Sequence, residues 1–162
     1  MPLILAHRGA CWEVPENTLE AFELAIAEEA DYVEFDVRAR NGELVICHDP
    51  GPPADVPSLD EILAALTGRI GLCVEVKEEE TADAVVDALE AHRARPEDLI
   101  VVSFQPGALE TVARRRPRIP AFCTRTTRRR PSASGGSASK SPRRRRVSRK
   151  LRRSAWQPRS SP

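Results

Sequence analysis

Ala6-His7-Arg8-Gly9 stands near the start of the chain, at the end of the apolar run that begins at Leu3. Three more polar stretches follow within the first fifty residues, each at or just past the end of an apolar run: Pro15-Glu16-Asn17-Thr18, Glu34-Phe35-Asp36-Val37 and His48-Asp49-Pro50. A fifth stretch, Cys73-Val74-Glu75-Val76-Lys77, comes later. Polar residues at strand ends are typical of a β/α barrel, whose chemistry lies at the carboxyl ends of the strands.

Apolar periodicity extends this pattern along the chain. Short apolar runs alternate with stretches of helical spacing, which predicts an α/β fold with a mainly parallel sheet. The predicted strands are residues 3–6, 32–37, 44–47, 72–76, 99–103 and, less completely, 119–122. A full barrel needs eight strands and about 250 residues. We therefore predict an incomplete (β/α)8 TIM-like barrel.

Capping signals place the starts of two helices. Asn17 with Glu20, and Ser58 with Glu61, have the spacing of a capping box. After Asn17, one apolar helical face is predicted from the spacing of Leu19, Phe22 and Ile26. After Ser58, the apolar positions are Leu59, Ile62, Leu63 and Leu66. Two more helices are expected, one from Thr81 with Val85, Val86 and Leu89 inside, and one over residues 106–116.

The pair Asn41-Gly42 predicts a turn between the second and third strands. The connection is too short for a helical crossover, so we expect a local antiparallel hairpin. A three-residue turn centred on Gly42 would set His48 beside Asp36 on one face of the sheet. A two-residue turn would put the two side chains on opposite faces, so a shared site favours the three-residue turn.

The chemistry of these residues points to phosphoryl transfer. Glu34, Asp36 and Glu75 offer hard oxygen ligands, as Mg²⁺ or Ca²⁺ prefers. An exposed strand face is the alternative for Glu34 and Asp36, but a central barrel strand has no solvated face to spare. Fixed positive charge suited to a phosphate comes from Arg8 and Lys77.

Two histidines complete the candidate site. His7 and His48 could act as a general acid–base pair near neutral pH. A lone histidine is more often structural, but these two lie among the ordered polar stretches, which favours a catalytic role. His92 lies on the predicted third helix and is expected to be merely solvated.

The five polar stretches, in this order, resemble the glycerophosphodiester phosphodiesterase family over about residues 3–122, with Ser103-Phe104 as a weaker later match. The resemblance implies a distorted barrel that hydrolyses glycerophosphodiesters to an alcohol and glycerol phosphate. It implies His7 and His48 as catalytic acid and base, without assigning which is which. It also implies metal at Glu34, Asp36 and Glu75, and phosphate contacts from Arg8 and Lys77. Glu16 and Asn17 would support the site.

The chain departs from the family pattern in three places. The family's insertion between the His-Asp pair and the Glu-x-Lys strand is nearly absent here, where only residues 50–57 remain. The alcohol is therefore left open, and the short form also resembles sphingomyelinase D type phospholipases. Glu29 replaces the glycine that commonly ends the first helix. The last strands, which close the barrel in the family, are missing.

Charge divides the chain into an acidic body and a basic tail. Residues 1–122 hold 11 Lys/Arg and all 24 acids, a net charge of −13, whereas residues 123–162 hold 14 Lys/Arg and no acid. We expect two segments: a partial barrel over 1–122 and a disordered Arg/Ser/Pro-rich tail over 123–162. A translation-frame error is the favoured interpretation of the tail. A solvated segment is the next, and an arm for nucleic acid or an anionic membrane is the least favoured.

Location and partners are predicted mainly by what the sequence lacks. The four cysteines form no CxxC pair, and Cys47 and Cys73 are expected to be small buried hydrophobes instead of zinc ligands. No signal peptide or membrane-spanning run is recognisable, so a cytoplasmic protein is expected. The expected partner is a small glycerophosphodiester. Nucleic acid is expected only if the tail binds it, and the metal and the oligomeric state are left open.

Overall fold

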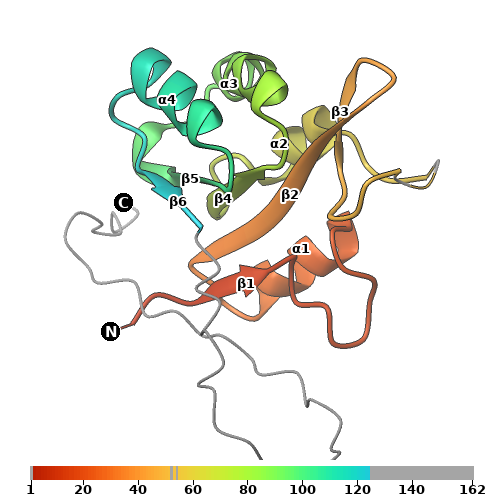
Figure 1. Ribbon diagram of the computed structural model, residues 1–162. Coiled ribbons are helices and arrows are strands. Elements are labelled where there is room, and N and C mark those ends of the chain that lie inside the picture. The colour runs from red at the N-terminus through yellow and green to blue at the C-terminus, as the bar shows by residue number, and fades with distance from the viewer. Residues whose placement is uncertain (1, 52, 54, 125–162) are drawn as a thin grey trace, which may run out of the picture.

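A single curved sheet organises the chain in the computed structural model, which describes residues 2–51, 53 and 55–124 (Figure 1). Five strands run parallel in the order β1-β2-β4-β5-β6. Their bounds are β1 Leu5–His7, β2 Tyr32–Arg40, β4 Gly71–Val76, β5 Leu99–Ser103 and β6 Ala121–Cys123. This is the predicted α/β half-barrel. The sequence predicts a disordered tail over residues 123–162. Its first residue, Cys123, is instead the last residue of β6, and residues 125–162 lie outside the described residues.

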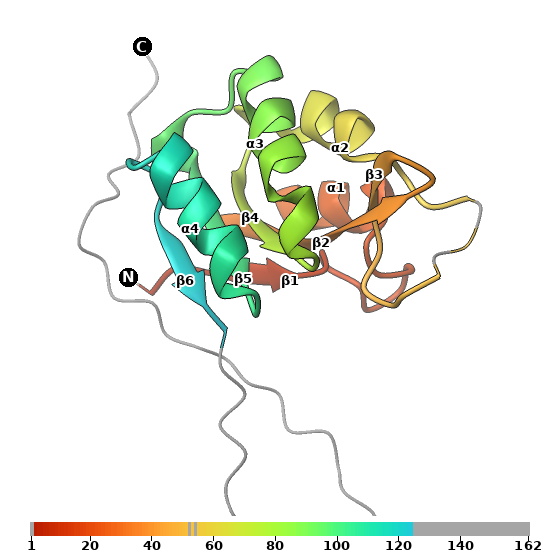
Figure 2. The same ribbon diagram turned by 45° about the horizontal axis from the view of Figure 1, so that its top comes forward.

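Four helices cover one face of the sheet: α1 Leu19–Ala27, α2 Leu59–Leu66, α3 Ala82–Ala91 and α4 Pro106–Arg115. Two short 3-10 helices, η1 Glu79–Thr81 and η2 Pro96–Asp98, lead into α3 and β5. Neighbouring helices touch one another, and α4, α3 and α2 form a row in front of the sheet in Figure 2. None of the described helices is long and apolar enough to span a bilayer.

The core lies between the sheet and these helices. Val33, Phe35 and Val37 of β2 are fully buried and belong to one apolar cluster with residues of all four helices. Strand side chains alternate, so Glu34 and Asp36 point to the opposite, helix-free face. The two faces of β2 therefore have separate roles: one packs the core and the other carries the polar site.

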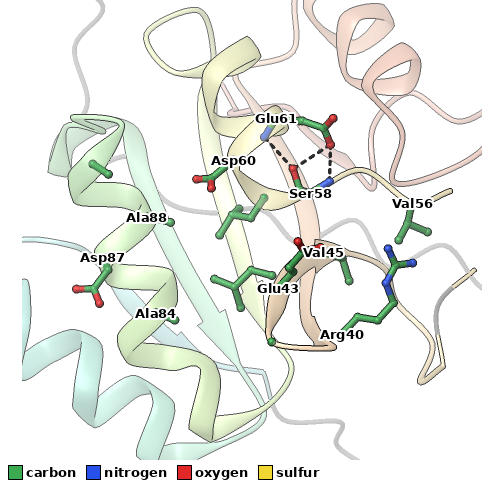
Figure 3. A pocket seen from close by; sticks show the side chains of 14 residues that line it. Arg40, Glu43, Val45, Val56, Ser58, Asp60, Glu61, Ala84, Asp87 and Ala88 are labelled. Carbon is green, nitrogen blue, oxygen red and sulfur yellow. Dashed lines mark hydrogen bonds between the residues drawn. The ribbon is translucent and has the colours of Figure 1, made fainter. Parts of the chain in front are cut away.

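The α2 start agrees with its sequence signal. The Ser58 side chain accepts a hydrogen bond from the Glu61 backbone N–H, and the Glu61 carboxylate accepts one from the Ser58 N–H (Figure 3). The predicted apolar face of α2 is fully buried and consists of Leu59, Ile62, Leu63 and Leu66. The strand predicted over 99–103 and the buried face of α3 are also found as expected.

The first strand and helix differ from the prediction. Strand β1 spans Leu5–His7, so His7 is part of the strand and not of the following loop. Thr18, not Asn17, is the N-cap of α1, and its hydroxyl accepts a hydrogen bond from the Ala21 N–H. Phe22 is buried and Ile26 is partly buried against the core, as expected, but Leu19 is exposed, and Ala21 and Ala25 are the other buried residues of α1. The Asn17 side chain instead donates a hydrogen bond to Asp36 of β2.

The hairpin is antiparallel as predicted, but the predicted three-residue turn is wrong. Strand β3, Glu43–Ile46, pairs with the far end of β2 with Arg40 opposite Glu43. The turn thus has two residues, Asn41 and Gly42, both with positive φ, which suits the twist of a tight hairpin. Strand β3 ends at Ile46, so His48 lies past the strand and its direction is not set by alternation.

Candidate metal and phosphate site

The sheet register assembles three carboxylates on the helix-free face. Glu34 and Asp36 lie on β2, and Asp36 is paired with Glu75 of β4. Paired residues of neighbouring parallel strands point to the same face, so the three side chains converge. All three are buried, with 4%, 0% and 7% exposure respectively. One oxygen from each lies within 4.8 Å of the others, a group that could hold a metal ion.

Two basic side chains enter the same cluster. The Lys77 Nζ lies 2.6 Å from Asp36 Oδ1 and 2.7 Å from Glu75 Oε1. The Arg8 Nε lies 3.2 Å from Asp36 Oδ2, and its Nη1 lies 2.6 Å from the Glu16 carboxylate. Two cations against three carboxylates leave the cluster short of positive charge if all three are ionised.

Asn17 supports the cluster in place of capping a helix. Its backbone is left-handed, with φ 58°, and its side chain is buried. The Asn17 Nδ2 donates to Asp36 Oδ2 at 2.9 Å, and its Oδ1 accepts from the Asp36 N–H at 3.4 Å. Asparagine tolerates this backbone conformation better than most residues. The loop from β1 to α1 is thereby fastened to β2 at the site.

His7 lies beside the carboxylates and faces outward. Its register partner is Glu34, and its Nε2 lies 3.7 Å from Glu34 Oε2. The side chain is 65% exposed. Partial burial, followed by the charge of Arg8, lowers its pKa below 6.5. A neutral imidazole at the mouth of the site is placed to exchange a proton with a bound molecule.

His48 lies two residues past the end of β3 and next to β2 through its backbone. The Cys47 N–H donates to the carbonyl of Asp36, which fixes the start of this loop. The His48 Nδ1 lies 2.7 Å from Asp49 Oδ1, so its ring contacts its chain neighbour instead of the three carboxylates. The structure thus brings together eight of the nine predicted site residues, with His48 next to them through the backbone.

Arg38 was missed by the sequence analysis. Its Nε donates to the His48 carbonyl at 2.9 Å, and its Nη1 pairs with the Glu78 carboxylate. It therefore positions the His48 loop. Arg38 is two residues past Asp36 on the same strand, so continuing the alternation of Glu34 and Asp36 by one step would have found it.

Burial and charge set opposite protonation tendencies on the carboxylates of β2. Burial, with the charges of Asp36 and Glu75, raises the pKa of Glu34 to about 8. Burial alone would also raise the pKa of Asp36, but hydrogen bonds from Lys77 and Asn17 and the charge of Arg8 lower it below its usual value. Glu34 Oε1 is buried without a hydrogen-bond partner. A cation bound at Glu34 would favour the ionised form of its carboxyl and would give the unpartnered Oε1 a partner.

A separate hollow lies on the helix side of the hairpin. It has a volume of about 780 Å³ between β3, the start of α2 and one side of α3. Figure 3 shows Glu43, Asp60 and Asp87 around it. None of the nine predicted site residues lines this hollow, so it is distinct from the carboxylate cluster.

Fold and site define an α/β half-barrel with an acidic centre at the carboxyl ends of its strands. Residues 7–71 match the model of the glycerophosphoryl diester phosphodiesterase family. The match covers less than half of the chain, so this part of the chain is similar to that family. A Mycobacterium tuberculosis protein named "Probable glycerophosphodiester phosphodiesterase 1" is 55% identical over 49 residues, which cover 30% of this chain and 18% of that protein. A Haemophilus influenzae glycerophosphodiester phosphodiesterase is 48% identical over 48 residues, 29% and 13% of the two chains.

Solved structures extend the similarity to the described fold. The glycerophosphodiester phosphodiesterase of Agrobacterium tumefaciens superposes with a TM-score of 0.65 at 28% identity, over 75% of this chain and 66% of that one. An Oleispira antarctica phosphodiesterase, solved with the product sn-glycerol-3-phosphate, gives a TM-score of 0.67 at 28% identity, over 82% and 69%. The chain spans less than half the length of the first curated relatives that it matches.

Proposed function

We propose that this chain is a metal-dependent phosphodiester hydrolase that acts on glycerophosphodiesters and releases an alcohol and glycerol 3-phosphate. One observation carries the proposal: Glu34, Asp36 and Glu75 are buried together beside Arg8 and Lys77. Carboxylates that hold a divalent cation, next to fixed positive charge, form a site for a phosphate group. The product seen in the Oleispira antarctica structure supports the same substrate class.

Each side chain then has a chemical task. Glu34, Asp36 and Glu75 would hold Mg²⁺ or Ca²⁺, which supplies Lewis-acid stabilisation of charge on the phosphoryl oxygens. Arg8 and Lys77 would bind the non-bridging oxygens, and Glu16 and Asn17 hold Arg8 and Asp36 in place. His7 and His48 would share the proton transfers, one donating to the leaving alcohol and the other accepting from the attacking water.

The partial barrel over residues 1–122 is proposed as the functional unit. Strand β6 ends at Cys123, one residue beyond that boundary, and the Thr124 N–H still donates to the Ser103 carbonyl. The alternative of a non-catalytic fragment with a nucleic-acid-binding tail concerns residues outside the described part. Because the relatives are longer, activity of this chain has to be measured on it directly.

Release of glycerol 3-phosphate from glycerophosphocholine, with Mg²⁺, Ca²⁺ or a chelator, tests the proposal. Folded protein should give product only with metal. Asp36→Asn should lower the turnover rate by at least about 100-fold, because a charged metal ligand is removed. Glu80→Gln, at an exposed acid, is the matched control. Equal turnover with metal and with the chelator, or no turnover by protein shown to be folded, contradicts the proposal.

The histidine roles have their own comparison. His7→Ala should lose about 10²–10⁴-fold in turnover, the usual contribution of general acid–base catalysis. His92→Ala is the matched control, because His92 lies on the helix side and pairs with Asp60 at 2.9 Å. This pairing corrects the expectation that His92 is merely solvated. Full activity of His7→Ala rules out the assigned mechanism.

A further inference from the structure

Lys77 lies between two of the three carboxylates that could hold a metal ion. Its Nζ bridges Asp36 Oδ1 and Glu75 Oε1 at 2.6 and 2.7 Å, and its side chain is only 9% exposed. Such a position is that of an internal counter-ion, which neutralises two buried carboxylates that would otherwise repel each other.

The oxygens of Asp36 and Glu34 differ in whether they already have a partner. Asp36 Oδ2 is taken by Arg8 and Asn17, and Asp36 Oδ1 by Lys77. Glu34 Oε2 accepts from the Arg8 N–H, whereas Glu34 Oε1 is buried without a partner. A cation that binds one oxygen of each carboxylate could bind Glu34 Oε1 directly. At Asp36, both oxygens are already paired with basic or amide groups.

A divalent ion, Lys77 and Arg8 are three cations that would compete for the same carboxylates. A divalent ion within a few ångströms of an ammonium is strongly repelled in a buried site. The lysine stem is long and flexible, so its head group can move while its backbone stays in place. The guanidinium of Arg8 is also held by Glu16, which leaves Lys77 as the more movable cation.

We propose that Lys77 is a displaceable counter-ion: a divalent cation takes its place at Asp36 and Glu75, and the released ammonium turns toward the mouth of the site. This rests on the proposed metal-dependent function and deepens it. Phosphate binding by Lys77 then depends on the metal, because the lysine is engaged with carboxylates until a cation arrives. The carboxylate cluster is thus kept folded without metal and becomes competent for phosphate with it.

Lysine labelling tests the movement without measuring activity. The full chain has three lysines, Lys77, Lys140 and Lys150. Acetylation by an amine-reactive ester, followed by site-resolved mass spectrometry, gives a rate for each. Saturating Mg²⁺ or Ca²⁺ should raise the Lys77 rate several-fold, with Lys140 and Lys150 as internal references. Tighter folding alone would slow labelling, so an increase has to come from release of the ammonium.

The variant Lys77→Met gives an independent readout. It keeps much of the side-chain length and removes the charge, so the metal-free carboxylates lose their counter-ion. Metal should therefore raise the melting temperature of Lys77→Met by more than that of the unaltered chain. Lys140→Met should behave as the unaltered chain. If Lys77→Met folds only with metal, it shows the same dependence in a stronger form.

The outcomes separate this proposal from the one on which it rests. Calorimetry first shows whether metal binds at all, and absence of binding overturns both. Binding with an unchanged or slower Lys77 rate, and equal temperature gains in both chains, overturns only the displacement of Lys77. Binding with faster Lys77 labelling and a larger gain for Lys77→Met supports it.

Discussion

Glu34 should make the metal-free protein less stable as pH rises. The raised pKa of about 8, against an ordinary value of 4.5, means that the folded state keeps a proton that the unfolded state releases. The folded state therefore binds more protons between about pH 4.5 and 8, and the free energy of unfolding falls across that window. Below it, both states are protonated and Glu34 contributes no penalty. Urea unfolding in a chelator measures the effect.

The variant Glu34→Gln isolates this carboxyl from the other acids. It keeps the shape and removes the titration, so the difference in unfolding free energy between the two chains should grow in its favour from pH 5 to 8. Parallel curves for Glu34→Gln and the unaltered chain over that range would exclude the protonated carboxyl.

Glu29 holds a backbone conformation that suits glycine. It follows α1 with φ 57°, where the Glu29 and Ala30 N–H groups donate to the carbonyls of Ile26 and Ala25 in a Schellman arrangement. Glu29→Gly should stabilise the protein by about 0.5–1 kcal/mol in urea unfolding. Glu28 has a negative φ, so Glu28→Gly is the control and should bring no gain. Equal effects of the two substitutions would contradict this account of the helix end.

Several site residues could be predicted one by one, but their partners could not. Strand alternation was enough to put Glu34 and Asp36 on one face, and both are found there. Asn17 has the residue type and spacing of a helix cap. The fold brings Asp36 close enough to accept a hydrogen bond from the Asn17 amide, whereas the local sequence predicts that Asn17 caps the helix. The cap falls one residue later, at Thr18.

At the scale of elements, two glycines with the same φ of 86° should respond differently to alanine. A Cβ on Gly9 would lie 2.7–2.8 Å from the Cβ and backbone of Ala21 in α1, whereas a Cβ on Gly42 would meet nothing within 4 Å. Gly42→Ala should cost about 1 kcal/mol, from backbone strain alone. Gly9→Ala should cost clearly more, because α1 must also move. Urea unfolding of both variants measures the difference, and equal costs would contradict the close packing of the Gly9 loop on α1.

The hairpin shows why an element's register is harder to predict than its existence. Asn41-Gly42 predicts the turn correctly, but a shared site of His48 and Asp36 favours a three-residue turn, which the register excludes. Positive φ at both residues favours the tight two-residue turn. His48 comes after the end of β3, so its position depends on the loop and on Arg38, not on strand alternation.

At the scale of the whole molecule, β–α alternation is enough to predict the fold class, and the number of predicted strands is enough to predict an incomplete barrel. In the described part of the sheet, β1 and β6 each have a single neighbouring strand. Closure depends on contacts between distant segments, which periodicity does not encode. The continuous apolar cluster joining all four helices explains how a half-barrel could still have one core.

The helix-free face should bind an apolar dye in the native protein. Phe122 on β6 is 50% exposed, and its register partner Val102 on β5 is only partly buried on the same face. Anilinonaphthalene sulfonate fluorescence should rise with folded protein and fall by about half in Phe122→Ser, while the thermal melt stays cooperative. Phe104→Ser, at an equally exposed phenylalanine after β5, is the comparison. A native protein without dye binding would contradict an open apolar face.

Calorimetric titration of the full chain with Mg²⁺ and Ca²⁺ tests the central claim most directly, because it asks whether the three buried carboxylates are a metal site. The account predicts one ion per chain, and a loss of at least about tenfold in affinity in Asp36→Asn, whose ligand charge is removed. Glu80→Gln should bind as the unaltered chain does. Absence of binding by folded protein, or equal affinity in Asp36→Asn, would contradict a metal site at Glu34, Asp36 and Glu75.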